Sequence, residues 1–164
     1  MNRWNFKDPE KGGLIKQEWI SGSVDQHTVD FAHRFGDYLA KPDKEQAMKN
    51  GRPELDNRGK PKMAVVGDMM TTSQLRRFFG EVKRQQIIGY EESSFVMLSP
   101  KLAYAVGRAK KDLKPGMKYS KLEDFFTLFD DAIKKVGSSS DKQMAFRNFI
   151  AIFEAIVAYH KAAE

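Results

Sequence analysis

Residues 71–89 have the sequence TTSQLRRFFGEVKRQQIIG, which predicts an amphipathic helix. At 100° per residue, four apolar side chains fall on one face and the charged side chains fall on the opposite face. The apolar positions are Leu75, Phe78, Phe79 and Val82. Thr71 stands three residues before Gln74, the arrangement of a capping box. We therefore expect the helix to start at Thr71 and to end near Gly89.

The segments that follow carry similar helix-start signals, a cap residue followed by proline or by a capping-box partner. These pairs are Ser99 with Pro100, Ser120 with Glu123, and Ser140 with Gln143. They predict helices over about 99–113 and 120–137, and a last helix from 140 almost to the C-terminus. The last two segments carry wide aromatic and aliphatic stripes, which are typical of helices in a bundle core or in a subunit contact.

The N-terminal part of the chain is less regular. The spacing of apolar residues predicts a helix over 24–40 with Ser23 as its cap. Residues 1–22 contain proline and three glycines and are expected to form an irregular leader. Residues 41–70 contain three prolines and three glycines among many charges, so we expect a long, mobile loop. The prediction is an all-α single domain, 1–164, of about five helices.

The polar face of the 71–89 helix is cationic. Arg76, Arg77, Lys83 and Arg84 share one stripe, with Glu81 as the acid nearby. Four cations on one stripe repel one another unless an anion is present. Gly80 lies within the stripe and costs about 1 kcal/mol of helix propensity relative to alanine, but it would let a phosphate approach closely. For this helix taken alone, a solvated surface is an equally good interpretation.

The next helix repeats the pattern. Lys101, Tyr104, Arg108 and Lys111 share the face opposite to its apolar residues. A tyrosine between cations can hydrogen-bond phosphate or sugar, or stack on a base, although Tyr104 fits equally well as a core aromatic at the helix flank. Two successive helices with matching basic faces favour a nucleic-acid site over a solvated surface.

The charge of the chain is concentrated in the same region. Residues 71–121 hold eleven basic and four acidic residues, whereas the whole chain has a net charge of +6. Concentrated positive charge indicates a polyanionic partner, with nucleic acid first and a membrane surface second. The basic helices need their aromatic residues for the core, which argues against a membrane surface. No apolar run at the N-terminus resembles a signal peptide, so we expect a soluble, cytoplasmic protein.

The sequence offers no catalytic chemistry. It contains no cysteine, which excludes thiol catalysis and cysteine-based zinc sites. The three histidines have no carboxylate at metal-ligand spacing, and no phosphate-loop, nucleophile-elbow or zinc-protease motif is present. His160 is expected to be a packing histidine of the last helix. We expect no catalytic residue, no metal and no cofactor.

Three stretches resemble one protein family. MTTSQLRRFFGEV at 70–82 is similar to the TTSQ-[IL]-R helix start of the small subunit of type III-A CRISPR effector (Csm) complexes. LSPKLAYAVGR at 98–108 resembles that family's PKLAYAxGR segment, and FIAIFEAIVAYHK at 149–161 resembles its C-terminal FEAIVAYHK helix. The likeness covers roughly residues 71–162 in the same order, and 41–70 looks like a lineage-specific expansion of a connecting loop.

The resemblance implies a non-catalytic helical subunit that is stacked in several copies along the interior of an RNA-guided effector complex. Its partners would be guide RNA paired to target RNA, the other subunits, and further copies of itself. The nuclease and the cyclic-oligoadenylate synthase would be other subunits. Carried over from the motifs, Arg76, Lys101 and Arg108 are the expected RNA contacts. Arg77, Lys83, Arg84, Tyr104 and Lys111 join them on the helical-face argument alone.

Two other functions remain open at the level of sequence. The main alternative is a helical scaffold whose basic faces dock acidic surfaces of partner proteins without touching RNA. The other is a small metal-dependent nuclease that acts through scattered carboxylates, which the absence of any motif disfavours.

Overall fold

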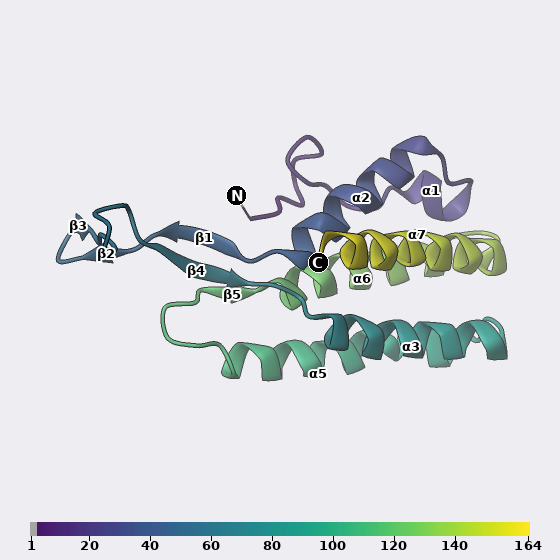
Figure 1. Ribbon diagram of the computed structural model, residues 1–164. Coiled ribbons are helices and arrows are strands. Elements are labelled where there is room, and N and C mark those ends of the chain that lie inside the picture. Colours follow the sequence, from purple (N-terminus) through teal and green to yellow (C-terminus); the bar gives the residue numbers. More distant parts are fainter. Residues whose placement is uncertain (1–2) are drawn as a thin grey trace.

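The computed structural model describes residues 3–164, which form seven helices and five short strands (Figure 1). The helices are α1 (Gln17–Ser21), α2 (Gln26–Ala40), α3 (Thr72–Ile88), α4 (Glu92–Val96), α5 (Leu98–Lys111), α6 (Lys121–Gly137) and α7 (Lys142–Ala163). The strands are β1 (Asp43–Gln46), β2 (Met48–Lys49), β3 (Arg52–Pro53), β4 (Met63–Asp68) and β5 (Tyr119–Ser120). The five long helices confirm a mainly helical fold, and the strands add a small amount of β structure that the all-α prediction did not include.

Helix α7 is the centre of the bundle. It contacts four other helices, namely α1, α2, α3 and α6. Helix α5 packs on α6. In Figure 1, α1 and α2 lie above α7, and α3 and α5 form a separate layer below it. No helix within residues 3–164 combines the length and the apolar character needed to cross a membrane.

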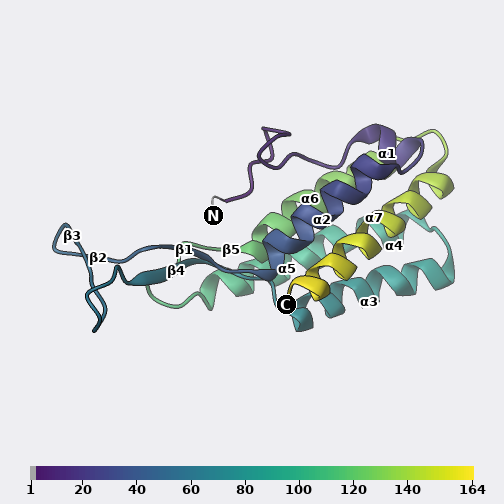
Figure 2. The ribbon, with the colours of Figure 1, turned by 45° about the horizontal axis from the view of Figure 1, so that its top comes forward.

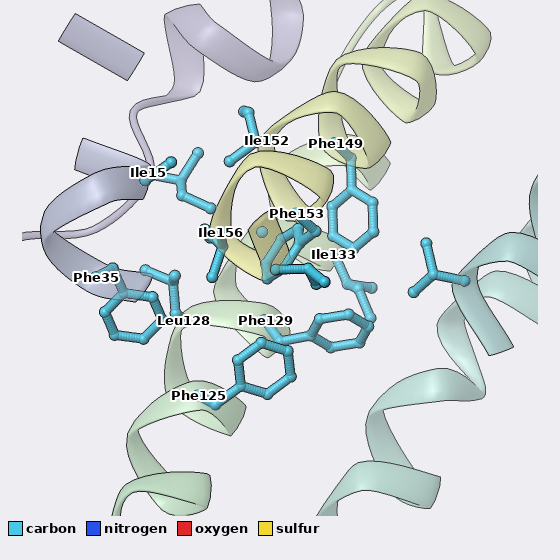
Figure 3. Close-up of a cluster of buried hydrophobic side chains, with 14 of the residues drawn as sticks. Ile15, Phe35, Phe125, Leu128, Phe129, Ile133, Phe149, Ile152, Phe153 and Ile156 are labelled. Carbon is cyan, nitrogen blue, oxygen red and sulfur yellow. The ribbon is translucent and has the colours of Figure 1, made fainter. Parts of the chain in front are cut away.

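The core between α6 and α7 is aromatic, as Figure 3 shows. Phe129 and Phe153 meet edge to face with ring centroids 5.1 Å apart, and Phe125 and Phe149 extend the cluster on either side. All four rings are almost fully buried. Edge-to-face pairs of this kind are each worth about 0.5–1.5 kcal/mol beyond the area they bury. The apolar stripes of the last two helices are therefore the core of this bundle.

A close crossing of α2 and α7 depends on Gly36. A Cβ atom at this position would lie 2.8 Å from the backbone oxygen of Ile156 and 2.8 Å from the backbone nitrogen of His160. Only glycine lets the two backbones approach so closely. His160 is itself buried, and its Nε2 donates a hydrogen bond of 2.7 Å to the backbone oxygen of Met70, so the packing role expected for it is confirmed.

The helix starts of α3 and α6 agree with the sequence, whereas the others shift. The capping box of α3 is present in both directions, because Gln74 N donates to Thr71 Oγ1 and Thr71 N donates to Gln74 Oε1. The carboxylates Asp25 and Asp141, rather than the expected Ser23 and Ser140, cap α2 and α7. Carboxylates bind free backbone N–H groups at least as well as hydroxyls do.

The segment at 99–113 also begins earlier than predicted. The short helix α4 leads directly into α5, which starts at Leu98 without a side-chain cap. Pro100 therefore stands inside the first turn, where its missing N–H removes no helical hydrogen bond. Ser120 does cap α6 by accepting from Leu122 N. The partner expected for it in a capping box, Glu123, forms an ion pair with Lys110 of α5 instead.

The leader is partly ordered against the bundle. Trp4 and Trp19 are buried, and Trp4 Nε1 donates a hydrogen bond of 2.9 Å to the backbone oxygen of Gly13. The short helix α1 was not predicted. The leader is otherwise made of turns, as expected, and the first two residues lie outside the described part.

The loop expected over 41–70 is instead a β arm, defined here as residues 43–68. Strand β1 pairs antiparallel with β4, and β4 continues into a parallel pair with β5, while β2 and β3 form a small hairpin at the far end. Figure 1 shows this arm extending well beyond the helices. The sequence signal was weak because nearly every residue from 44 to 64 is exposed, so no apolar alternation marks the strands.

A buried polar cluster holds the base of the arm. Lys121 has no exposed surface, and its Nζ lies 2.8 Å from Asp43 Oδ1 and donates to the backbone oxygens of Tyr38 and Lys41. The hydroxyl of Tyr119 donates to Asp43 Oδ2. Burial lowers the pKa of Lys121 and raises that of Tyr119. This cluster ties the end of α2, the start of β1 and the start of α6 together.

Candidate nucleic-acid interface

A groove between α3 and α5 brings together residues from both basic helices. It has a volume of about 310 Å³. Its polar and charged lining consists of Gln74, Arg77, Tyr104, Arg108 and Asp112. The floor is apolar, with Phe78 of α3 and Leu122 of α6. The groove lies at the end of the layer where α3 begins and α5 ends.

The sequence orients the two helices so that their cations face outward. In α3, Leu75 and Val82 are buried, which leaves the arginine stripe on the opposite side. In α5, Leu102 and Val106 are buried in the same way. The burial of both helices therefore agrees with the faces that helix periodicity predicts.

Tyr104 is 70% exposed and lies beside the arginines of the groove. This rules out the alternative of a core aromatic at the helix flank. An exposed ring flanked by guanidinium groups offers a stacking surface together with hydrogen-bond donors.

Four of the eight candidate residues are cations that have no acidic partner in the described part of the chain. They are Arg76, Arg77, Arg108 and Lys111, and all are exposed. Cations without intramolecular partners keep their full charge available for an external anion.

The other three cations are engaged. Lys83 forms an ion pair with Glu154 of α7, and its Nζ lies 5.3 Å from the ring centroid of Phe79. Glu81 pairs with Arg84 at 3.3 Å and with Lys101 of α5 at 3.5 Å, so one carboxylate bridges the two basic helices. Helical spacing could not separate the paired cations from the unpaired ones, because it does not reveal partners on other helices.

Both basic stripes contain a glycine that the fold itself does not require. A Cβ atom at Gly80 or at Gly107 would have no neighbour within 4 Å. Gly107 falls on the stripe of Tyr104, Arg108 and Lys111, as Gly80 does on that of α3. Glycine lowers helix stability at both places without relieving any contact, which fits close approach of a ligand backbone.

Sequence reasoning missed Gln74 and Asp112 as lining residues. Gln74 was noted only as a capping residue, and Asp112 stands just after the last turn of α5. The helical spacing of Asp112 from Arg108 (four residues) was the available signal. The carboxylate of Asp112 marks one edge of the cationic region, because its negative charge repels phosphate.

Two further observations concern the rest of residues 3–164. No group of three or more His, Asp or Glu side chains in this part gathers as a metal site would require. A second hollow of about 430 Å³ lies between the leader and α2, and it contains none of the candidate residues.

The fold and this site define a small, mainly helical protein with a cationic, tyrosine-bearing face. The family model described as Csm2 Type III-A matches residues 55–164. The chain therefore belongs to the Csm2 family, the small subunit of the type III-A CRISPR effector complex. Neither a curated protein nor a solved structure matches the chain. The groove and both basic helices lie within the matched residues, whereas β1, β2 and β3 precede them.

Proposed function

We propose that this subunit is non-catalytic and holds the sugar–phosphate backbone of the guide and target RNA inside the cytoplasmic effector complex. The observation that carries the proposal is the set of four exposed cations without acidic partners around the groove of α3 and α5. Phosphate contacts of this kind position a strand without reading its sequence, because the phosphates are the same in every sequence.

Each residue has a role in this proposal. Arg77 and Arg108 lie on the two helices that border the groove and contact successive phosphates, while Arg76 and Lys111 extend the contact beyond it. Tyr104 stacks on a base or bonds to a sugar hydroxyl. Glu81 links the two helices through its pair with Lys101, and Lys101 and Arg84 add to the positive field.

A single copy offers only a few contacts, so its affinity for RNA should be modest. Stacking of several copies along one strand makes the later contacts intramolecular and raises the overall affinity. An exposed set of apolar residues lies where α3 ends and α5 begins, and it is suited to contacts with other subunits or copies. It consists of Ile87, Ile88, Val96 and Met97.

The test is a salt series of fluorescence anisotropy with labelled single-stranded RNA, comparing wild type with the variant Arg76→Ala, Arg77→Ala, Arg108→Ala and Lys111→Ala. Loss of four phosphate contacts should reduce the slope of log K against log salt by about 3. A control variant removes four exposed cations elsewhere, Lys7, Lys11, Arg147 and Lys161, and should keep a slope close to wild type.

Equal slopes for wild type and the helix-face variant would reject this site. If the same variant instead lost binding to an acidic partner subunit, the alternative of a protein-docking scaffold would replace the proposal. Cleavage of the RNA by pure protein with divalent cations would contradict the non-catalytic assignment.

A further inference from the structure

The β arm contributes little to the packing of the molecule. Residues 44–64 are almost entirely exposed, and β1 is buried only at its first residue. A two-stranded ribbon alone is marginally stable in water, so a long exposed one generally depends on an anchor or a partner. The Lys121 cluster supplies the anchor at the base. The far end of the arm, which holds β2 and β3, lies well away from the helices (Figure 1).

The tip of the arm divides into two tight turns, which Figure 2 shows as two separate loops beyond the β1–β4 ribbon. The first joins β2 to β3 through Asn50 and Gly51, whose φ values of 53° and 75° are those of a type I′ turn. Lys49 and Arg52 flank it and stand directly opposite each other in the ladder. Like charges in a directly opposed pair are destabilising unless an anion lies between them.

The second turn also carries two exposed cations, Arg58 and Lys60, and it is held by the side chain of Asp56. Asp56 accepts hydrogen bonds at its Oδ1 from the backbone nitrogens of Arg58 (2.8 Å) and Lys60 (3.0 Å). Gly59 between them has a φ of 75°. The single carboxylate of the turn is thus hydrogen-bonded to the backbone, and the side chains of Arg58 and Lys60 are exposed.

The four tip cations, Lys49, Arg52, Arg58 and Lys60, are exposed, and none has an ion-pair partner among the described residues. By contrast, Lys62 and Lys118, nearer the base of the arm, pair with Glu54 and Glu45. Among the described residues of the arm, Lys44 near the base also lacks an ion-pair partner, but the four cations at the tip form the larger group of unpaired positive charge.

The arm leaves the bundle at the end where α3 begins and α5 ends, which is the end that holds the groove (Figure 1). The backbone of β4 leads directly into α3, and α5 leads into β5 at the arm's base. The two regions of unpaired cations thus lie in succession along the long dimension of the molecule. An extended polyanion seated in the groove would run toward the tip.

We propose that the forked tip of the arm is a second contact for the RNA phosphate backbone, separate from the groove of α3 and α5. The identity of the polyanion as RNA rests on the function proposed above. A phosphate between Lys49 and Arg52 would relieve the repulsion within that pair, and Arg58 and Lys60 would offer two further cations at the second turn. One subunit then holds an RNA strand at two places, and the anchored arm sets the distance between them.

The test uses the full chain with Lys49→Ser, Arg52→Ser, Arg58→Ser and Lys60→Ser, which leaves Asn50, Gly51, Asp56 and Gly59 in place. Anisotropy with a long unstructured single-stranded RNA should show a salt slope reduced by about 3, since four phosphate contacts are lost. The remote control variant at Lys7, Lys11, Arg147 and Lys161 carries the same loss of charge and should keep a slope close to wild type. A charge-conserving variant, with Lys and Arg exchanged at the four tip positions, should also retain it.

The outcomes separate this inference from the proposed function. A wild-type slope in the tip variant overturns the arm contact, whether or not the helix-face variant has lost its own. A reduced slope in the tip variant beside an unchanged helix-face variant upholds the arm and rejects the groove. Unchanged RNA binding together with lost self-association would assign the arm to a protein contact through exposed Met48 and Leu55, and would also overturn the inference.

Discussion

Lys121 is the residue on which the geometry of the arm depends most directly. It is a fully buried cation with one carboxylate and two backbone oxygens as partners, and its Nζ lies 3.8 Å from the ring centroid of Tyr38. A buried ion pair contributes little net stability compared with apolar residues, but removal of one partner leaves an uncompensated charge. The pair therefore specifies where the arm attaches more than it stabilises the bundle.

Lys121→Ala should lower the free energy of unfolding by about 3–5 kcal/mol, because Asp43 would remain buried without its cation. Lys118→Ala removes the exposed pair with Glu45 at the same end of the arm and should cost less than about 1 kcal/mol. Urea denaturation followed by circular dichroism measures both. A loss for Lys121→Ala no larger than that for Lys118→Ala would contradict the anchoring role.

At the scale of elements, two helical glycines have opposite roles. Gly36 allows the crossing of α2 and α7, whereas Gly80 lies on an open helix face. The first is required by packing within the chain. The second lowers the stability of α3 and, under the proposed function, serves the ligand instead.

Gly36→Ala should destabilise the protein by roughly 1–3 kcal/mol, because its Cβ would press on the backbone of α7. Gly80→Ala should stabilise it by about 1 kcal/mol through helix propensity, and should weaken RNA binding by hindering the approach of the backbone. Thermal melts and anisotropy on the two variants provide the comparison. Tighter RNA binding by Gly80→Ala would argue against close approach at this glycine.

Elements with a local, periodic signal were predictable from the sequence. The capping box of Thr71 and Gln74, the apolar stripes of α6 and α7, and the outward cations of α3 and α5 all follow from helical spacing. The strands were not predicted because β1 is buried only at Asp43. An aspartate is typical of loops, and its burial is explained only by its ion pair with Lys121. The division of the cations into paired and unpaired depends on contacts such as Lys83 with Glu154, which sequence spacing does not reveal.

At the scale of the whole molecule, stability should depend on pH through two tyrosines. Burial, and then the charge of Asp124, raises the pKa of Tyr38, and burial raises the pKa of Tyr119. The unfolded chain releases these protons near pH 10, whereas the folded chain retains them. The stabilising contribution is thus complete below about pH 10 and is lost as the pH rises above it.

Wild type should therefore lose stability more steeply between about pH 10 and pH 12 than the variant Tyr38→Phe/Tyr119→Phe, which has neither proton to retain. The lowered pKa of Lys121 acts in the opposite sense in both proteins. Denaturation midpoints across this range provide the measurement. Parallel curves for the two proteins would show that these hydroxyls do not govern the pH response.

The parallel pairing of β4 with β5 also bears on how the chain acquires its shape. The β1–β4 ribbon joins neighbouring segments and is a local structure, but its attachment to β5 and Lys121 closes a loop that contains all of α3, α4 and α5. Such a closure becomes favourable only once the intervening helices have packed, because the entropy of the open loop opposes it. During synthesis on the ribosome, the β1–β4 hairpin emerges long before β5 and Lys121, which fix the base of the arm. The direction of the arm relative to the helices is therefore set among the last events of folding.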